Sequence, residues 1–340
     1  MNLTEYLHRL VTGSHLTEAE AEAAMGIIMG GGATPAQIGA FLGALRVKGE
    51  TVEEIAGFAR AMRAKALQVR SRHPLVIDTC GTGGDGAGTF NLSTAAALVV
   101  AACEVPVAKH GNRSVSSRCG SADVLEALGV KVDLPPAEVA RCLDEVGFGF
   151  LLAPSFHPAM KHAAGPRREL GIPTVFNLLG PLCNPAGAQA QLVGVYDGNL
   201  VETVARVLGY LGSRRALVVH GSDGLDEVTI TGPTYVAEWR GGRVLTYLFD
   251  PADVGLTYAD SSELAGGDAE TNAALIQSVL AGERGPRRQA VVLNAAFALV
   301  AAEKAADFRE GILLAEAALD SGRARAKLEE LVAFSRRAAA

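Results

Sequence analysis

Residues 76–117 read VIDTCGTGGDGAGTFNLSTAAALVVAACEVPVAKHGNRSVSS, and the stretch alternates the patterns of two kinds of secondary structure. The apolar runs LVID and VPVAKH are short and rich in β-branched residues, whereas TAAALVVAAC between them has the length and composition of a helix. A strand, a helix and a second strand in this order predict a βα unit with parallel strands. The loop after the first run carries Gly81, Gly83 and Gly86 at the G-x-G-x-x-G spacing of a dinucleotide-binding fingerprint.

A dinucleotide-binding site of this kind also needs an acidic residue at the end of the second strand, about 20 positions on. Glu104 lies at about that distance, but it precedes the second run, and the far end of that run carries Lys109 and His110. A cation there favours a second phosphate over a ribose hydroxyl. The alternative is that the glycines only make a tight turn and that Ser93 or Thr94 only caps the following helix.

The first 72 residues repeat one helix-start pattern three times. In each repeat, a threonine hydroxyl and a side chain three residues later can satisfy reciprocal backbone donors at a helix N-terminus. The pairs are Thr17 with Glu20, Thr34 with Gln37, and Thr51 with Glu54. We therefore expect a small all-helical domain here.

After Pro74, short strand patterns alternate with Ala- and Leu-rich helix patterns up to the C-terminal tail. Residues 154–185 are irregular, which suggests a crossing between domains. The sequence thus predicts an α/β fold with a small helical domain, residues 1–72 joined by part of 160–190. It also predicts a larger α/β domain, residues 73–159 and 191–340, with a mostly parallel central sheet.

Composition limits the classes of partner. The chain has 340 residues, 49% hydrophobic and 20% charged, and a formal net charge of −6, so it offers no general attraction to nucleic acid or to an anionic membrane. The five cysteines are scattered without a C-x-x-C pair, which suggests neither a disulfide framework nor a structural zinc site. With no signal-peptide pattern at the N-terminus, we expect a cytoplasmic protein.

Three further polar segments could carry chemistry. The segment KHGNRSVSSRCGSAD, residues 109–123, concentrates donor side chains directly after a strand, where α/β folds place ligands. The doublet Asp226-Glu227 lies in a glycine-containing loop after the run ALVVHG, and such carboxylates suit Mg²⁺ that also contacts substrate phosphates. Arg167 in GPRRELG could hold a carboxylate through its planar fork. Taken singly, each segment is also compatible with a solvated loop or turn, and for Arg167 and the Asp226-Glu227 doublet this is the more common case.

Taken together, GTGGDGAGTFNLST, KHGNRSVSSRCGSADVLEALG, FNLLGPLCNP and HGSDGLDEVTITGPTYVAE resemble the motifs of the anthranilate phosphoribosyltransferases of tryptophan biosynthesis. The resemblance extends over nearly the whole chain. It implies a fold of the nucleoside phosphorylase and phosphoribosyltransferase type and a homodimer. It also implies transfer of phosphoribosyl from 5-phosphoribosyl 1-diphosphate (PRPP) to the amine of anthranilate, with release of pyrophosphate and with Mg²⁺, two ions per subunit.

The same resemblance implies roles for single residues. For catalysis it implies Lys109, Asn112 and Arg167; for anthranilate, Gly81, His110, Asn112 and Arg167; and for the metal, Ser93, Asp226 and Glu227. For PRPP it implies Gly81, Gly84, Asp85, Thr89, Asn91, Leu92, Ser93, Thr94, Lys109, His110, Gly111, Asn112, Arg113, Ser114, Val115, Ser116, Ser117 and Ser121.

The sequence departs from the family pattern near one of these residues. Pro166 directly precedes Arg167, where a proline could bend or restart the helix, and Pro173 stands where the family often has arginine. Two other functions come into question. A pyrimidine nucleoside phosphorylase has a similar fold but a different phosphate motif, and a nucleic-acid-binding paralogue would carry a basic groove. We see neither feature in the sequence.

Overall fold

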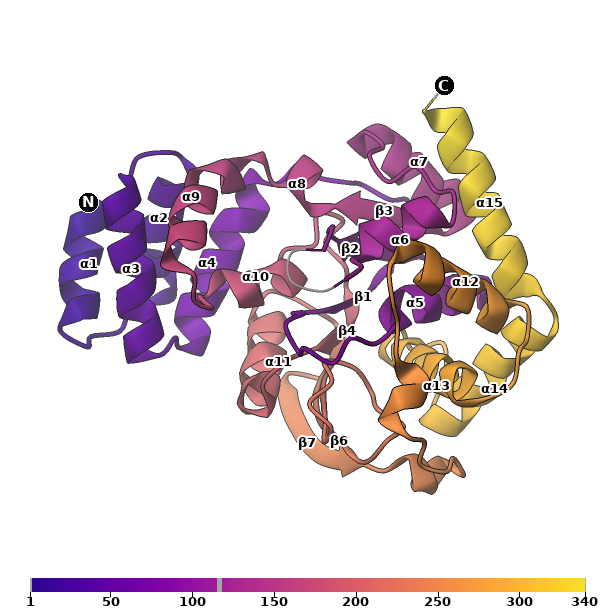
Figure 1. Ribbon diagram of the computed structural model, residues 1–340. Helices are drawn as coiled ribbons and strands as arrows, with labels where there is room; N and C mark the ends of the chain where they lie inside the picture. Colours follow the sequence, from indigo (N-terminus) through magenta and orange to yellow (C-terminus); the bar gives the residue numbers. More distant parts are fainter. Residues whose placement is uncertain (1, 115–117, 340) are drawn as a thin grey trace.

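The computed structural model describes residues 2–114 and 118–339. Figure 1 shows a helical domain at one end of the molecule and a larger domain, built around a sheet, at the other. The predicted combination of a small helical domain with an α/β domain is confirmed. Among the described residues we find no helix that is long and apolar enough to cross a membrane.

Four helices open the chain: α1 (Leu3–Val11), α2 (Glu18–Met29), α3 (Pro35–Lys48) and α4 (Val52–Lys65). The three predicted capping boxes are confirmed at the starts of α2, α3 and α4. At α3, Thr34 Oγ1 accepts the Gln37 N–H at 3.3 Å and Gln37 Oε1 accepts the Thr34 N–H at 2.9 Å. Phe41 and Phe58 meet edge to face in the core between these helices, with ring centroids 5.9 Å apart.

The irregular middle of the chain returns to the helical domain. After β3 (Phe148–Leu152), which belongs to the sheet, it contains α8 (Ala153–Phe156), a 3₁₀ turn (Pro158–Met160), α9 (Lys161–Leu170) and α10 (Phe176–Leu182). Helix α9 lies against α2 and α3 (Figure 1). A Cβ atom on Gly31, between α2 and α3, would lie only 2.8 Å from His162 Cε1 of α9. Helix α9 thus packs on the first helices of the chain, while the predicted domain bounds at 72, 159 and 191 stay predictions.

The sheet of the larger domain has the strand order β3-β2-β1-β4-β5-β6-β7. Its strands besides β3 are β1 (Ile77–Gly81), β2 (Val107–Gly111), β4 (Ala190–Gly194), β5 (Arg215–Gly221), β6 (Thr234–Arg240) and β7 (Arg243–Phe249). The pairs from β3 through β5 are parallel, and β6 and β7 add an antiparallel hairpin at the edge. The mostly parallel sheet is therefore confirmed.

Helices cover both faces of this sheet. They are α5 (Leu92–Ala102), α6 (Ser121–Ala127), α7 (Pro136–Val146), α11 (Val201–Tyr210), α12 (Ala269–Leu280), α13 (Pro286–Ala301), α14 (Phe308–Asp320) and α15 (Arg323–Ala338). Because strand side chains alternate between faces, Leu217 and Val219 of β5 join the core that contains α13, whereas Val218 joins the core that contains α11. Burial on both faces fits the apolar strand patterns of the sequence.

The parallel strands end at one edge of the sheet. Gly81 of β1 is in register with Gly194 of β4, and Gly194 with Val219 of β5. The loops after β1 and β5 therefore leave the sheet side by side, and β2 ends beside them at Gly111. This edge is where open α/β sheets bind ligands.

Candidate active site

The glycine-rich loop after β1 meets the acidic doublet at Asp226. The Gly83 N–H donates to Asp226 Oδ2 at 2.7 Å. A Cβ atom on Gly81 would lie 2.3 Å from the same oxygen, and one on Gly194 would lie 1.5 Å from the Asp226 carbonyl oxygen. The absence of a side chain at Gly81 and Gly194 is therefore what lets the β5 loop approach this closely.

The second carboxylate of the doublet lies at the N-terminus of α5. Glu227 Oε1 accepts the Ser93 N–H at 3.1 Å, which places a negative group at the positive end of the helix dipole. The alternative that Ser93 or Thr94 only caps this helix does not hold, because the N-cap residue is Asn91, and its side chain makes no cap hydrogen bond. Glu227, distant in sequence, satisfies one of the free backbone donors instead.

Burial and mutual repulsion make this doublet electrostatically unfavourable without a counter-ion. Burial, together with the charges of Glu227 and Asp85, raises the pKa of Asp226 well above its usual value. Burial raises the pKa of Glu227 to about 7, against the attraction of Lys109. A site in which neighbouring carboxylates raise one another's pKa gains stability when a cation binds between them.

Lys109 lies beneath the same cluster. The residue is only 2% exposed, and its ammonium group donates to Ser93 Oγ at 3.2 Å and to the Thr79 carbonyl. Burial lowers the pKa of Lys109, while the charges of Asp78, Glu227 and Asp226 oppose that shift. Among the described residues no carboxylate oxygen lies within 4 Å of its ammonium nitrogen. The lysine therefore provides a positive charge next to Ser93 without being neutralised by a direct ion pair.

The loop after β2 is folded onto the start of α6. Ser121 Oγ accepts the Asn112 N–H at 3.2 Å, and a Cβ atom on Gly111 would lie 2.2 Å from that hydroxyl oxygen. The Arg113 guanidinium makes two hydrogen bonds to Glu126 of α6, and the Ser114 N–H donates to Asp123. The positive charge of Arg113 is thus paired with acids in this structure, and Val115, Ser116 and Ser117 lie outside the described residues.

The loop between β1 and α5 is held by partners distant in sequence. Thr89 forms a single bridge with Ala265, and Asn91 Oδ1 accepts an amide hydrogen of Asn272 at 2.9 Å. Gly84, at φ +84°, needs the left-handed backbone that only glycine adopts readily. Leu92 is buried in the core, and the Thr94 hydroxyl is buried without a partner among the described residues. The residues of this loop predicted to bind PRPP therefore divide into exposed loop positions and positions that pack the helix.

Arg167 lies in α9, on the segment that connects β3 to α10. Its guanidinium is 4.9 Å from the ring centroid of Phe176, the first residue of α10, and burial lowers its pKa. Among the described residues we find no ion pair of Arg167 with an acidic side chain, so its charge is available to a ligand. The helix does not restart at Pro166, because α9 runs from Lys161 to Leu170 with this proline inside it.

Helix α10 connects Arg167 to the loop after β2. His110 Nδ1 lies 3.1 Å from the Gly180 carbonyl oxygen near the end of α10. The rings of His110 and His157 have centroids 5.1 Å apart, and both residues are more than nine-tenths buried. The Nε2 atom of each ring has no partner among the described residues. Burial lowers the pKa of His110 to about 3 and that of His157 to about 4, so both rings are neutral at pH 7.

Sequence reasoning missed several residues that shape the site. Asp78 lies inside an apolar strand and Asn184 inside the motif FNLLGPLCNP, so neither has a local pattern of its own. Asn272 and Phe176 come from distant segments. A carboxylate within an otherwise apolar run was the one available signal, since such a group needs a buried partner.

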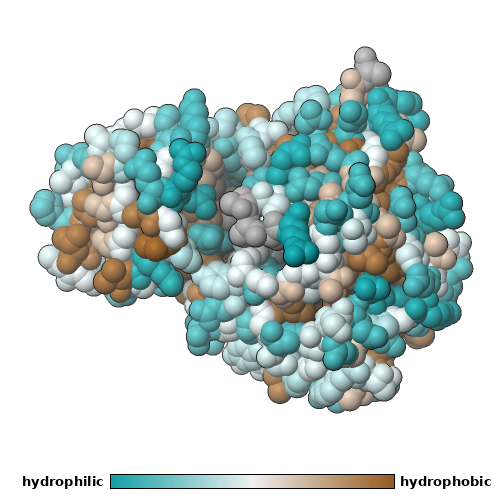
Figure 2. Space-filling model, viewed as in Figure 1, coloured by the Kyte–Doolittle hydropathy of each residue, from teal (hydrophilic) through white to brown (hydrophobic). Residues whose placement is uncertain are grey.

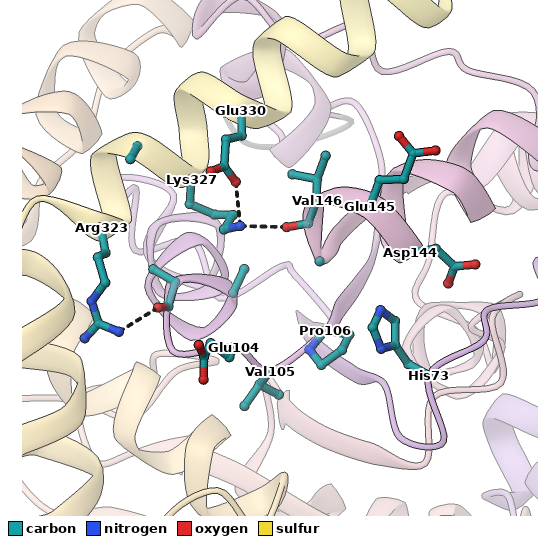
Figure 3. Close-up of a pocket in the computed structure, with 14 residues that line it drawn as sticks. His73, Glu104, Val105, Pro106, Asp144, Glu145, Val146, Arg323, Lys327 and Glu330 are labelled. Atoms are coloured by element: carbon teal, nitrogen blue, oxygen red, sulfur yellow. Dashed lines mark hydrogen bonds and ion pairs between the residues drawn. The ribbon is translucent and has the colours of Figure 1, made fainter.

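A surface hollow of about 380 Å³ lies at the opposite end of the parallel strands, where α5 and α7 end (Figure 3). Two cations there cap helix ends: Lys327 donates to the Val146 carbonyl at 2.8 Å, and Arg323 donates to the Ala102 carbonyl at 3.4 Å. Glu104 also lines this hollow. The acidic residue at the distance expected for dinucleotide binding is therefore at the wrong end of the strand.

Comparison with known proteins agrees with the motifs. The model of the glycosyl transferase family, a/b domain, matches residues 73–325, and that of the family's helical bundle domain matches residues 4–66. The anthranilate phosphoribosyltransferase of Moorella thermoacetica is 64% identical over 332 residues, which cover 98% of each chain. The chain belongs to the anthranilate phosphoribosyltransferase family. The family resemblance drawn from the motifs is thereby confirmed.

Solved structures of this family share the fold. The anthranilate phosphoribosyltransferase of Thermus thermophilus superposes with a TM-score of 0.93 at 47% identity, covering 99% of this chain and 100% of that one. The anthranilate phosphoribosyltransferase of Saccharomyces cerevisiae in complex with PRPP and Mg superposes with a TM-score of 0.90 at 30% identity, covering 98% of each chain. Its counterpart in complex with 4-fluoroanthranilate has a TM-score of 0.88.

The residues present fit Mg²⁺ of the kind that the anthranilate phosphoribosyltransferase family implies. Among the described residues, no group of three or more His, Cys, Asp or Glu side chains is arranged to hold a metal ion by itself. Mg²⁺ commonly keeps several waters and binds through one or two carboxylates together with substrate phosphates. Asp226, whose pKa is raised by burial and by the charges of Glu227 and Asp85, and Glu227, which accepts from Ser93, supply such a partial set of oxygen ligands.

Proposed function

We propose that the protein transfers the phosphoribosyl group of PRPP to the amine of anthranilate, a step of tryptophan biosynthesis. The products are N-(5-phosphoribosyl)anthranilate and pyrophosphate. The observation that carries the proposal is the meeting of three loops at one edge of the sheet. In the glycine-rich loop after β1, the Gly83 N–H donates a hydrogen bond to Asp226, and at the start of α5 the Ser93 N–H donates one to Glu227. The ammonium group of Lys109 in β2 donates to the hydroxyl of the same Ser93.

This arrangement suits a substrate with a diphosphate and a monophosphate. The backbone N–H groups of the glycine-rich loop and of the α5 N-terminus face anions favourably, and Lys109 adds a full charge. The chain supplies only part of the positive charge that a diphosphate needs. Mg²⁺ held by Asp226 and Glu227 would supply the rest of the positive charge that a diphosphate needs.

The reaction needs little from the protein beyond charge and position. The C1′–O bond breaks, its electron pair leaves with pyrophosphate, and the lone pair of the aromatic amine forms the C1′–N bond. Lys109 is placed to stabilise the leaving group. The nitrogen then loses a proton to solvent, and since the amine attacks in its neutral form, no strong base is required. Rate therefore depends on how well amine and C1′ are held in line.

We assign the anthranilate carboxylate to Arg167, with Asn112, Gly81 and His110 beside the ring. Support comes from the half-buried guanidinium of Arg167, which stacks on Phe176 and lacks an acidic partner among the described residues. A half-buried arginine in this state binds a carboxylate strongly, because both hydrogen bonds of the fork are charge-assisted. The imidazoles of His110 and His157 are neutral, and their Nε2 atoms, which have no partner among the described residues, leave hydrogen-bonding capacity next to the proposed position of the ring.

We further propose two Mg²⁺ ions per subunit, held by Ser93, Asp226 and Glu227. The two carboxylates of the doublet contact different loops, Asp226 the glycine-rich loop and Glu227 the start of α5. The doublet therefore has two sides on which an ion could bind. Equilibrium dialysis with PRPP present should count two bound ions, and a count of one contradicts this part of the proposal.

We also propose a homodimer in the cytoplasm. Figure 2 shows apolar residues at the surface of the helical domain. In that domain Val11 is 63% exposed and Val47 is 90% exposed, which is unusual for branched apolar side chains. Cys80, Cys103, Cys142 and Cys183 carry free thiols, as in proteins of reducing compartments. Size-exclusion chromatography with light scattering tests the dimer directly. A dimer should have twice the molar mass of the 35.2 kDa chain.

The test of the function is product analysis. The protein is incubated with PRPP, anthranilate and Mg²⁺, and ³¹P resonance follows the conversion of PRPP to pyrophosphate and phosphoribosyl product. We expect one pyrophosphate per anthranilate consumed, and no conversion when any component is omitted. Phosphate-dependent cleavage of pyrimidine nucleosides in parallel reactions would instead support the nucleoside phosphorylase alternative. Binding of nucleic acid without turnover would support the non-catalytic alternative, which the net charge of −6 disfavours.

A further inference from the structure

A buried carboxylate below the proposed site ties three segments together. Asp78 is fully buried in β1. Its Oδ1 accepts the backbone N–H of His110 in β2 at 3.1 Å, and its Oδ2 accepts from Asn184 Nδ2 at 2.7 Å. Both oxygens of the carboxylate are therefore used, each by a different segment of the chain.

Asn184 extends this connection. It follows α10 in the chain and is only 3% exposed. Its Nδ2 donates to the Ala108 carbonyl at 2.7 Å as well as to Asp78, and its Oδ1 accepts the Ala186 N–H at 2.8 Å. The side chain thus bridges β1, β2 and the connection from α10 to β4, and its amide groups are fully used.

A buried charge in this position is costly and needs a reason. The transfer of a carboxylate from water to the protein interior costs several kcal/mol unless charges and hydrogen bonds compensate. The nearest compensation is the buried Lys109, whose charge attracts that of Asp78 without direct contact. A neutral side chain could bridge β1 and α10 at lower cost, but it would leave Lys109 with less compensation inside the protein.

From this geometry we propose that Asp78 is a positioning residue, which with Asn184 fixes the end of β2 and thereby Lys109, His110 and Asn112. This inference rests on the proposed function. Asp78 itself is too deeply buried to touch a substrate. It acts through the backbone of His110, whose ring is fixed at the other side by the Gly180 carbonyl. The strand end is thus held from β1 and from α10 at once.

The test compares Asp78→Asn with the wild-type protein. The amide has the size of the carboxylate, but its NH₂ group takes the place of one of the two accepting oxygens. This NH₂ group then faces another donor, either the His110 N–H or Asn184 Nδ2. We expect kcat/KM for PRPP and for anthranilate to fall about 30-fold or more, since misplacement of reacting groups by about 1 Å can cost 10²-fold. The circular dichroism spectrum should be unchanged.

The matched control is Glu238→Gln. Glu238 is also a buried carboxylate of this sheet, and it pairs with Arg215 at 2.8 Å near the other end of β5. The same chemical change there should lower the Tm but leave kcat/KM within about threefold, so loss of stability and loss of positioning are separated.

A second variant and a double variant complete the test. Asn184→Ala keeps the charge of Asp78 and removes the bridge, and we expect about a tenfold loss of kcat/KM. Because both residues act through one connection, Asp78→Asn combined with Asn184→Ala should lose much less than the product of the single losses. If Asp78→Asn does not fold, Asn184→Ala decides by the same criterion.

Two failures are distinguishable. A wild-type protein that shows no transfer contradicts the proposed function. A wild-type protein that is active, together with folded variants at positions 78 and 184 whose kcat/KM stays within threefold, overturns the positioning role alone.

Discussion

Glu227 Oε1 accepts the backbone N–H of Ser93 at 3.1 Å, across 134 positions of sequence. This contact joins the acidic loop after β5 to the start of α5, which is the helix that follows the glycine-rich loop. The negative charge and the helix terminus stabilise each other. Binding of Mg²⁺ and phosphate at this place would therefore affect both loops together.

The first prediction concerns the metal. Asp226→Asn and Glu227→Gln each remove one charge of the doublet, so the Mg²⁺ concentration for half-maximal rate should rise about tenfold or more in each. Initial rates over a Mg²⁺ titration at saturating PRPP measure this. Asp133→Asn, at an exposed position, serves as the control and should leave the titration unchanged. An unaltered Mg²⁺ dependence in both doublet variants contradicts the proposed metal site.

Arg167 and Arg168 offer a matched pair for the second prediction. Arg167 is partly buried over Phe176, whereas Arg168 is exposed. Arg167→Ala should raise KM for anthranilate at least about tenfold, because a charge-assisted bidentate contact is lost, and should change KM for PRPP much less. Arg168→Ala should change neither. Equal effects of Arg167→Ala on the two substrates would show that this residue does not hold the aromatic acid.

The third prediction tests the close approach at Gly81. A methyl group there would lie 2.3 Å from Asp226 Oδ2, so Gly81→Ala must displace the carboxylate or the loop. We expect a fall in kcat of about 10²-fold, as reacting groups lose their alignment. Gly39→Ala introduces a methyl group with no atom within 4 Å and should leave the rate unchanged. Similar rates for both variants would mean that the loop adapts without loss.

The comparison of sequence and structure shows which kinds of feature are local. The capping boxes at Thr17, Thr34 and Thr51 depend on residues three positions apart, and all three are confirmed. The strands that carry Gly81 and Lys109 were also found, because runs of β-branched residues between turns are a local signal. The fold class followed from the order of these elements.

Contacts between distant segments could not be predicted in the same way. Glu227, and not a neighbouring side chain, accepts the free Ser93 N–H at the start of α5. No sequence pattern near Ser93 or Glu227 indicates this contact. The pairing of Asp78 with Asn184 joins positions 106 residues apart. The site assignments for Lys109, Asn112 and Arg167 came from the family resemblance and stay predictions until they are tested by substitution.

The fourth prediction concerns acid stability. His157 has its pKa lowered to about 4 by burial, whereas an unfolded histidine titrates near 6.5. Between these values the unfolded chain binds a proton that the folded chain does not, so this residue makes the free energy of unfolding fall as pH decreases below about 6.5.

Removal of the imidazole removes that dependence. After correction for any difference at pH 7, His157→Phe should be more stable than the wild-type protein at pH 5 by about 2 kcal/mol. Urea unfolding at both pH values provides the measurement. Parallel pH profiles for the two proteins would mean that His157 is not held neutral in the folded state.

The central claim is the transfer of phosphoribosyl to anthranilate at the meeting of the three loops. The most direct measurement is the loss of anthranilate fluorescence on mixing the purified protein with PRPP and Mg²⁺, together with the Asp226→Asn and Arg167→Ala variants. We predict a loss only when all components are present, and a slower loss in each variant at limiting Mg²⁺ or limiting anthranilate. Fluorescence that stays constant with the complete mixture and the folded wild-type protein would contradict the claim.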